Sequence, residues 1–141
     1  MVKKTIRQGE IIHYSAGALI QKENRYLLIN RFKPPFGFAG LAGHVEENET
    51  FEEAVKREVN EESDLLVTEI KFLIEGETSF GEHCTKGARK HIWKVFECKT
   101  KGKIKINKKE VKSYDWYTPK EIKELKLEHA WEYWFKQLKI I

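Results

Sequence analysis

The sequence predicts a layered α/β sandwich, and two observations lead to this fold class. Apolar, β-branched-rich runs of strand length lie between turn residues, whereas stretches near residues 50–63 and 125–138 repeat apolar residues at helical spacing. The chain has 141 residues, of which 40% are hydrophobic and 34% charged. This composition fits one soluble domain (residues 1–141) with its own core.

The first third of the chain predicts strands and a loop. Glu10–Gln21 and Arg25–Phe32 are apolar runs on either side of the turn 22–24, which is typical of a hairpin. The stretch 33–40 contains prolines and glycines and therefore predicts an irregular loop.

The remaining elements are mainly strands, followed by helices. Leu65–Glu75, Ala88–Cys98 and Val111–Tyr117 predict strands, and Pro119 opens a short helix. Apolar residues at helical spacing predict a last helix whose aromatic side chains we interpret as core packing rather than a ligand site: Leu125, Leu127, Ala130, Trp131, Trp134, Phe135 and Leu138.

Composition also narrows the cellular context. No apolar run reaches the roughly 18–20 residues of a membrane span, and the start of the chain lacks the apolar stretch of a signal peptide, so we expect a cytoplasmic protein. Cys84 and Cys98 do not make a disulfide framework. The spacing of His83, Cys84 and His91 matches no standard zinc motif, which favours a strand-and-loop segment there.

Charge is distributed unevenly along the chain. Gly43–Asp64 contains nine acidic and two basic residues and has a local charge of −7. Because the whole chain has a net charge of +4, the other residues carry +11. A basic surround could steer a polyphosphate towards an acidic centre, although a solvated surface explains the same lysines. The lysines are scattered rather than interleaved with aromatics, so nucleic acid is not the favoured partner.

The acidic segment predicts a helix with an unusual face. Thr50 and Glu53 have the spacing of a capping box. At about 100° per residue the apolar face (Phe51, Ala54, Val55 and Val59) should point at the sheet, opposite Glu53, Lys56 and Asn60. Three acids project along the apolar side: Glu58, Glu61 and Glu62.

Carboxylates at this spacing repel one another and lose hydration when covered. A hard divalent cation resolves that repulsion, and oxygen ligands suit Mg²⁺ or Mn²⁺. A solvated, Glu-rich helix is the alternative.

The wider pattern resembles the signature box of the Nudix hydrolases, Gly-x5-Glu-x7-Arg-Glu-U-x-Glu-Glu-x-Gly-U, in which U is a bulky aliphatic residue. The chain matches it from Gly43 to Leu65, about a sixth of its length, except that Asp64 replaces the last glycine. In the family that glycine ends the helix, and Asp tolerates the left-handed conformation less well than Gly. The resemblance implies an α/β/α sandwich with a mixed, mostly antiparallel, curved sheet.

The resemblance also implies roles for individual residues. Glu58, Glu61 and Glu62 resemble the metal ligands, joined by the backbone carbonyl of Ala42 or Gly43. Arg57 and Glu49 resemble the pair that orients the loop against the helix. Glu110, which precedes Trp116, resembles a further ligand or general base of some relatives, although it could be a surface residue. Glu61, Glu62 or Glu110 would accept the proton of the attacking water.

The implied reaction is the Mg²⁺-dependent hydrolysis of a nucleoside diphosphate linked to a group X. Ser79–Cys84 carries neither the proline of ADP-ribose-cleaving relatives nor the tyrosine of dinucleoside polyphosphate relatives, which favours a nucleoside triphosphate, damaged or not. ADP-ribose or a nucleotide sugar is the alternative substrate. A non-catalytic nucleotide sensor and a cap-removing factor are alternative functions, and a homodimer is compatible with the family. Four aromatics are candidates for stacking on a base: Phe36, Phe38, Phe80 and Trp93.

Overall fold

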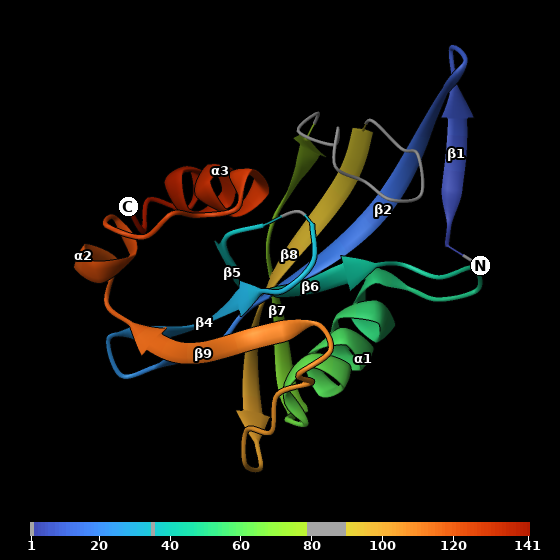
Figure 1. Ribbon diagram of the computed structural model, residues 1–141. Helices are drawn as coiled ribbons and strands as arrows, with labels where there is room; N and C mark the ends of the chain where they lie inside the picture. Colours follow the sequence, from blue (N-terminus) through green and yellow to red (C-terminus); the bar gives the residue numbers. More distant parts are fainter. Residues whose placement is uncertain (1, 35, 79–89) are drawn as a thin grey trace.

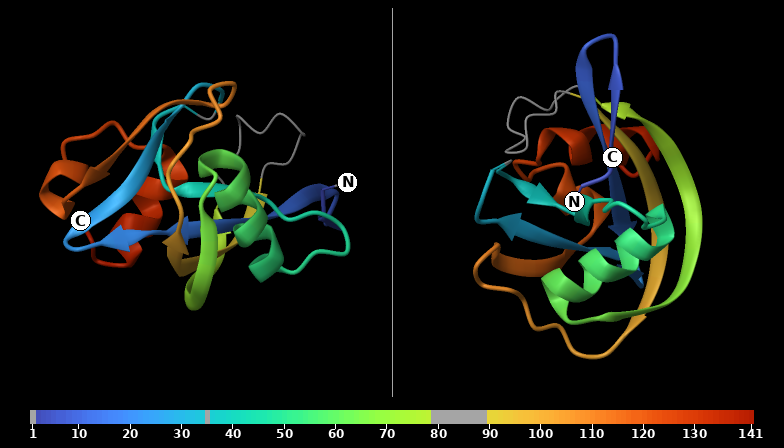
Figure 2. Two further views of the ribbon diagram at one scale, coloured as in Figure 1. Left: turned by 90° about the horizontal axis from the view of Figure 1, so that it is seen from below. Right: turned by 90° about the vertical axis from the view of Figure 1, so that its right-hand side faces the viewer.

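The computed structural model describes residues 2–34, 36–78 and 90–141. Strands lie between helix α1 and the pair α2 and α3 (Figures 1 and 2). The helices are α1 (Phe51–Ser63), α2 (Pro119–Ile122) and α3 (His129–Gln137). The predicted α/β sandwich is confirmed. Within the described ranges, no helix is both long and apolar enough to cross a membrane.

The strands form two sheets. The first contains β1 (Lys4–Arg7), β2 (Glu10–Leu19), β6 (Leu41–His44), β7 (Leu66–Thr78) and β8 (Lys90–Lys101). The second contains β3 (Gln21–Lys22), β4 (Arg25–Arg31), β5 (Phe38–Ala39) and β9 (Val111–Tyr117). Strands β2 and β8 pair in parallel and the other paired strands are antiparallel, so the first sheet is mixed.

The predicted hairpin between Glu10–Gln21 and Arg25–Phe32 is wrong over most of its length. Only its tip forms, where β3 pairs with the start of β4 (Gln21 with Tyr26, Lys22 with Arg25). Strand β2 leaves this hairpin for the first sheet, where it lies between β1, β6 and β8. The physical reason is that β2 is covered on both faces and takes its partners from distant segments, which a local pattern does not reveal.

The later strands agree with the sequence, and β7 and β8 extend beyond their predicted ends. Two register shifts in this pair, between Val67 and Glu69 and between Phe72 and Ile74, bend both strands. Figure 2 shows them curving around α1. Strand β9 has its predicted bounds, whereas β1, β5 and β6 were not predicted from sequence.

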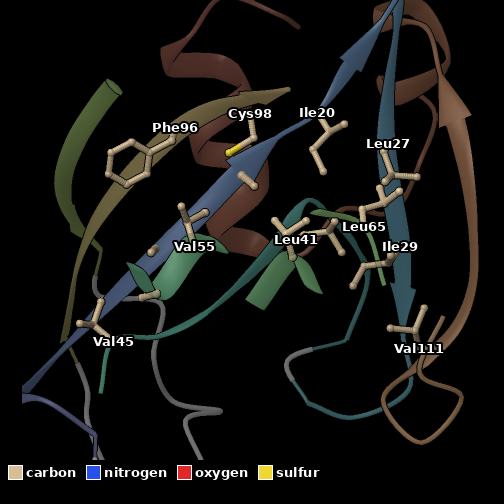
Figure 3. Packing of buried hydrophobic residues seen from close by; sticks show 14 residues of the cluster. Ile20, Leu27, Ile29, Leu41, Val45, Val55, Leu65, Phe96, Cys98 and Val111 are labelled. Carbon is tan, nitrogen blue, oxygen red and sulfur yellow. The ribbon is translucent and has the colours of Figure 1, made fainter. Parts of the chain in front are cut away.

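Two apolar clusters hold the layers together. Along β2, Ala16 and Ala18 face the cluster around α1, whereas Leu19 faces the cluster around α3. This alternation shows that one strand separates the two cores. Figure 3 shows the first cluster, with Val55 of α1 and Phe96 of β8 among its members.

The aromatic residues of α3 build the second core, as predicted. Trp131, Trp134 and Phe135 are fully buried. Two glycines give the Trp131 ring its space: a Cβ at Gly17 would lie 2.9 Å from the ring, and one at Gly40 would lie 2.6 Å from it. Leu125 and Leu127 precede the helix instead of belonging to it, because α3 begins after Glu128.

Glu128 is an acid inside this apolar region. Its backbone N–H donates to the carbonyl of Phe38, which fixes the start of α3 against β5. Burial raises the pKa of the Glu128 carboxyl to about 7, and the nearby positive charge of Arg31 lowers it only in part. The fold therefore accepts a destabilised carboxylate at this helix start.

We predict that Gly40→Ala lowers the free energy of unfolding by about 1–3 kcal/mol, because its methyl group overlaps the Trp131 ring. Urea denaturation measures this loss. In a Trp131→Leu background, Gly40→Ala should lower the free energy of unfolding far less, because the ring that its methyl group would overlap is absent. An equal loss in both backgrounds would contradict the contact.

We also predict a pH-dependent difference in stability between the wild type and Glu128→Gln. The folded chain holds the Glu128 proton more tightly than the unfolded chain, so stability from this group falls as pH rises from about 4.5 to about 7. Relative to the variant, the wild type should lose roughly 2–3 kcal/mol across that window. Denaturation at each pH measures both proteins, and parallel profiles would contradict the prediction.

Candidate active site

Helix α1 begins with the capping box that the sequence predicts. The Thr50 hydroxyl accepts a hydrogen bond from the backbone N–H of Glu53 (3.0 Å), and the Glu53 carboxylate accepts one from that of Thr50 (2.9 Å). Ala54, Val55 and Val59 are fully buried against the sheet. The cap and this apolar face fix both the start and the rotation of the helix.

The end of α1 shows how Asp64 replaces a glycine. Asp64 adopts the left-handed conformation (φ 65°), and its N–H donates to the carbonyl of Asn60. The Asn60 side chain donates in turn to the carbonyl of Leu65 (3.3 Å). The backbone geometry expected of the box is therefore kept without the glycine, at the strain that a side chain brings to this region.

Glu62 is the most deeply buried acid of the helix, with only 2% of its surface exposed. Its carboxylate accepts a hydrogen bond from the N–H of Ala42 in β6 (3.0 Å), and an oxygen lies 3.9 Å from the Arg31 guanidinium. Burial raises the pKa of Glu62 well above its ordinary value, and the charge of Glu58 raises it further. Arg31 and the Ala42 N–H offset only part of this.

Glu58 lies beside Glu62 and against Gly43. A Cβ at Gly43 would overlap the Glu58 carboxyl group, so only glycine lets the strand and this side chain approach so closely. Burial raises the pKa of Glu58 to about 7, Arg57 lowers it, and the charges of Glu61 and Glu110 raise it. The two inward acids thus share a region with too little positive charge.

Glu61 differs from the expectation that all three acids turn inward. Its side chain is 53% exposed and forms an ion pair with Arg57 (3.3 Å). On a helix with about 100° per residue, Glu61 lies about 80° from the direction of Phe51, which places it on the flank. It therefore lies at the rim of the acidic site, whereas Glu58 and Glu62 lie inside.

Arg57 connects the helix to the loop before it. Its guanidinium donates to both carboxylate oxygens of Glu49 (2.8 and 3.0 Å), to the carbonyl of His44 (2.9 Å) and to Glu58 (2.8 Å). These bonds lower the pKa of Glu49 and raise that of Arg57. The geometry is the bidentate pair that the sequence predicts for Arg57 and Glu49.

Glu110 comes close to the acidic site from a distant part of the chain. It directly precedes β9, and its carbonyl accepts a hydrogen bond from the N–H of Phe32, which follows β4 (2.8 Å). Its charge raises the pKa of both Glu58 and Glu62. The side chain is exposed, so it stands at the solvent edge of this group of acids.

Two charged residues near the acids, Arg31 and Glu128, were not predicted from the sequence. Arg31 ends β4, and its positive charge lowers the pKa of both Glu62 and Glu128. Its buried Nε has no hydrogen-bond partner among the described residues. Two signals were available. Arg31 ends an apolar strand, and Glu128 lies on the helical spacing of Leu125 and Trp131.

The four candidate stacking residues have different environments. Phe36 is 63% exposed, and Phe38 is half-buried in an edge-to-face contact with Tyr117. Trp93 is 7% exposed and packs against Trp131 and Trp134, so it is a core residue and not a free stacking surface. Phe80 lies outside the described residues.

The chemistry of the donors fits a hard cation. Carboxylates of Glu58, Glu61 and Glu62 and the backbone of β6 offer oxygen alone, and two of the acids are buried with incomplete charge compensation. In residues 2–34, 36–78 and 90–141, no three His, Cys, Asp or Glu side chains already stand around a common metal position. Of the sequence considered for zinc, His83 and Cys84 lie outside the described residues.

Comparisons with known proteins agree with this architecture. Residues 12–138 match the family model of the NUDIX domain. In an alignment over 74 residues, the chain is 39% identical to the ADP-ribose pyrophosphatase of Methanocaldococcus jannaschii, a match that covers 45% of this chain and 44% of that protein. The match therefore spans less than half of the relative's length.

Solved structures share the fold at low sequence identity. The MutT NUDIX hydrolase from Burkholderia pseudomallei superposes with a TM-score of 0.78 at 22% identity, over 89% of this chain and 97% of that one. The MutT protein from Bacillus halodurans gives 0.70 at 22% identity, over 88% and 80%. With the family model matching most of its length and the box geometry in place, the chain belongs to the Nudix hydrolase family.

Proposed function

We propose that this protein is a Mg²⁺-dependent pyrophosphohydrolase that cleaves a phosphoanhydride bond in a nucleoside diphosphate linked to a group X. The observation that carries the proposal is the placement of the half-buried Glu58 and the fully buried Glu62 on the side of α1 that packs against β6. A buried pair of carboxylates destabilises the fold unless a cation joins it. Such a pair is therefore expected where carboxylates bind a metal ion, and Mn²⁺ is suitable as well as Mg²⁺.

In this proposal Glu58, Glu61 and Glu62 hold the ion together with a backbone carbonyl of Ala42 or Gly43. A bound Mg²⁺ would neutralise diphosphate charge and acidify the attacking water. Arg57 and Glu49 keep α1 and the strand β6 in register through bonds that do not involve the ion. A carboxylate at the site accepts the water's proton.

Three residues are candidates for that proton acceptor: Glu61, Glu62 and Glu110. Glu61 and Glu110 are exposed to solvent, so each can contact a water molecule. Glu62 is held by the N–H of Ala42, which favours a ligand role for it. Geometry therefore supports Glu61 or Glu110 over Glu62 as the base, within the same overall mechanism.

The preferred substrate is a nucleoside triphosphate, damaged or not, cut to a monophosphate and pyrophosphate. The partial match to an ADP-ribose pyrophosphatase favours ADP-ribose as the second candidate. Phe36 and Phe38 lie near each other in the chain before β6, and they stay candidates for contact with a base together with Phe80. The proposal includes a cytoplasmic location, where such nucleotides are found.

A non-catalytic nucleotide sensor is the contrasting reading. A protein that only binds a nucleotide does not need two neighbouring acids whose burial destabilises the fold. Here Glu58 and Glu62 form such a pair, and the exposed Glu61 lies beside them. A cap-removing activity would call for contacts along an RNA chain, which no motif of this sequence indicates. Catalysis on a small nucleotide therefore accounts for more of the site.

We predict that the wild type with Mg²⁺ releases pyrophosphate or a nucleoside monophosphate from at least one member of a panel of triphosphates, ADP-ribose and nucleotide sugars. Chelation with EDTA should abolish the reaction. Glu62→Gln should lower kcat by roughly 10²-fold or more, because the amide keeps the shape but loses the charge. Chromatography of the products measures turnover and identifies the bond cleaved.

Glu52→Gln is the matched control, because Glu52 is an exposed acid of the same helix. It should keep wild-type turnover, and circular dichroism should show that both variants are folded. Binding without turnover across the whole panel would support the sensor instead. Normal turnover of Glu62→Gln would remove this residue from the mechanism.

We predict that Arg57→Lys lowers both stability and kcat, since an ammonium group cannot reproduce the bidentate pair with Glu49 and the bond to the His44 carbonyl. The expected loss of unfolding free energy is about 1–3 kcal/mol. The neighbouring change Lys56→Ala, at an exposed position, should leave both nearly unaltered. Thermal melts and initial rates compare the two variants. If Arg57 is only a surface charge, Arg57→Lys and Lys56→Ala should have equal stability and equal kcat.

A further inference from the structure

Three histidines from three adjacent strands gather on one face of the first sheet. The parallel register of β2 and β8 sets His13 beside His91, and the antiparallel register of β2 and β6 sets Ser15 beside His44. Because side chains alternate along a strand, His13 and Ser15 share a face. That face is opposite the one from which Tyr14 contacts Phe51 of α1.

We propose that His13, His44 and His91 form a second metal site, which takes a borderline transition-metal ion such as Zn²⁺, Co²⁺ or Ni²⁺. The site is separate from the carboxylates of α1 and does not depend on the proposed hydrolysis. Neutral imidazoles suit these ions, whereas Mg²⁺ prefers oxygen ligands. Neither the box nor the cysteine spacing points to it.

The spacing of the rings is the main argument. The ring centroids are 5.1 Å apart for His13 and His44, 5.2 Å for His44 and His91, and 5.8 Å for His13 and His91. Tetrahedral binding with metal–nitrogen bonds of about 2.0–2.1 Å places imidazole centres about 5 Å apart. All three separations fall near that value, although the residues come from sequence positions up to 78 apart.

Two of the three rings are buried, and a hydroxyl group lies beside one of them. His13 is 3% exposed and His91 is 9% exposed. Burial lowers the pKa of His91 to about 4, with a contribution from His13. The Ser15 hydroxyl lies 3.3 Å from Nδ1 of His91, which is the kind of partner that orients a ligating imidazole through its other nitrogen.

The rings must reorient before all three can bind one ion. Within the described residues, no three such side chains have their donor atoms already around one point, and the rings of His44 and His91 lie only 10° from parallel. Rotation about the Cβ–ring bond moves the nitrogens without displacing the strands. His44 is half-buried and more exposed than His13 and His91.

The test is a Co²⁺ titration of the untagged full chain, followed by visible absorption, with Zn²⁺ calorimetry alongside. The wild type should bind one equivalent in a site with d–d bands typical of tetrahedral coordination. His44→Ala and His91→Asn should each weaken binding by at least about tenfold, the loss that removal of even a hydrogen-bonding partner of a ligand can cause. Competition with excess Mg²⁺ should leave the bands unchanged.

Two controls locate the site. His129→Ala removes an exposed histidine of α3, outside the cluster, and Glu62→Gln alters the carboxylate site; both should retain the bands. Circular dichroism and thermal melts establish folding, and the half-buried position of His44 makes His44→Ala decisive if His91→Asn unfolds. Bands that persist in His44→Ala, or that disappear in Glu62→Gln, would overturn the proposal.

Discussion

The approach of α1 to β6 is the constraint on which the site depends. Gly43 has no Cβ, so the Glu58 carboxyl group can lie directly against the strand. One residue earlier, the Ala42 N–H donates to Glu62, and one residue later the His44 carbonyl accepts from Arg57. Three consecutive backbone positions thus fix three side chains of one helix, and none of these contacts survives if the helix shifts by a residue.

The arrangement that positions the acids of the site also lowers the stability of the fold. Glu58, Glu62 and Glu128 have carboxyl groups whose charged forms are disfavoured by burial, and the charge of Arg31 offsets this in part at Glu62 and Glu128. The fold offsets this strain with the two apolar cores and with the Arg57 clamp. Local conflicts of this kind are expected where a site binds a charged ligand, and not in a region whose role is packing.

Local chemistry explains which features the sequence revealed. The capping box at Thr50, the strand β9 and the Arg57–Glu49 pair depend on neighbours within a few residues or on a dense motif, and all were predicted. The pairing of β2 was not, because its partners lie in distant segments. The expectation that Glu61 turns inward was wrong because its direction, about 80° from that of Phe51, lies at the flank of the apolar face, where the side chain is exposed.

Strand β6 (Leu41–His44) contributes to both proposed metal sites. Gly43 faces the carboxylates of α1, and the next side chain, His44, points to the other face, where His13 and His91 lie. The sheet therefore separates oxygen donors from nitrogen donors by its own thickness. Ions that prefer one donor type gain little on the other face, so the alternation of a strand is enough to keep the two proposed sites selective.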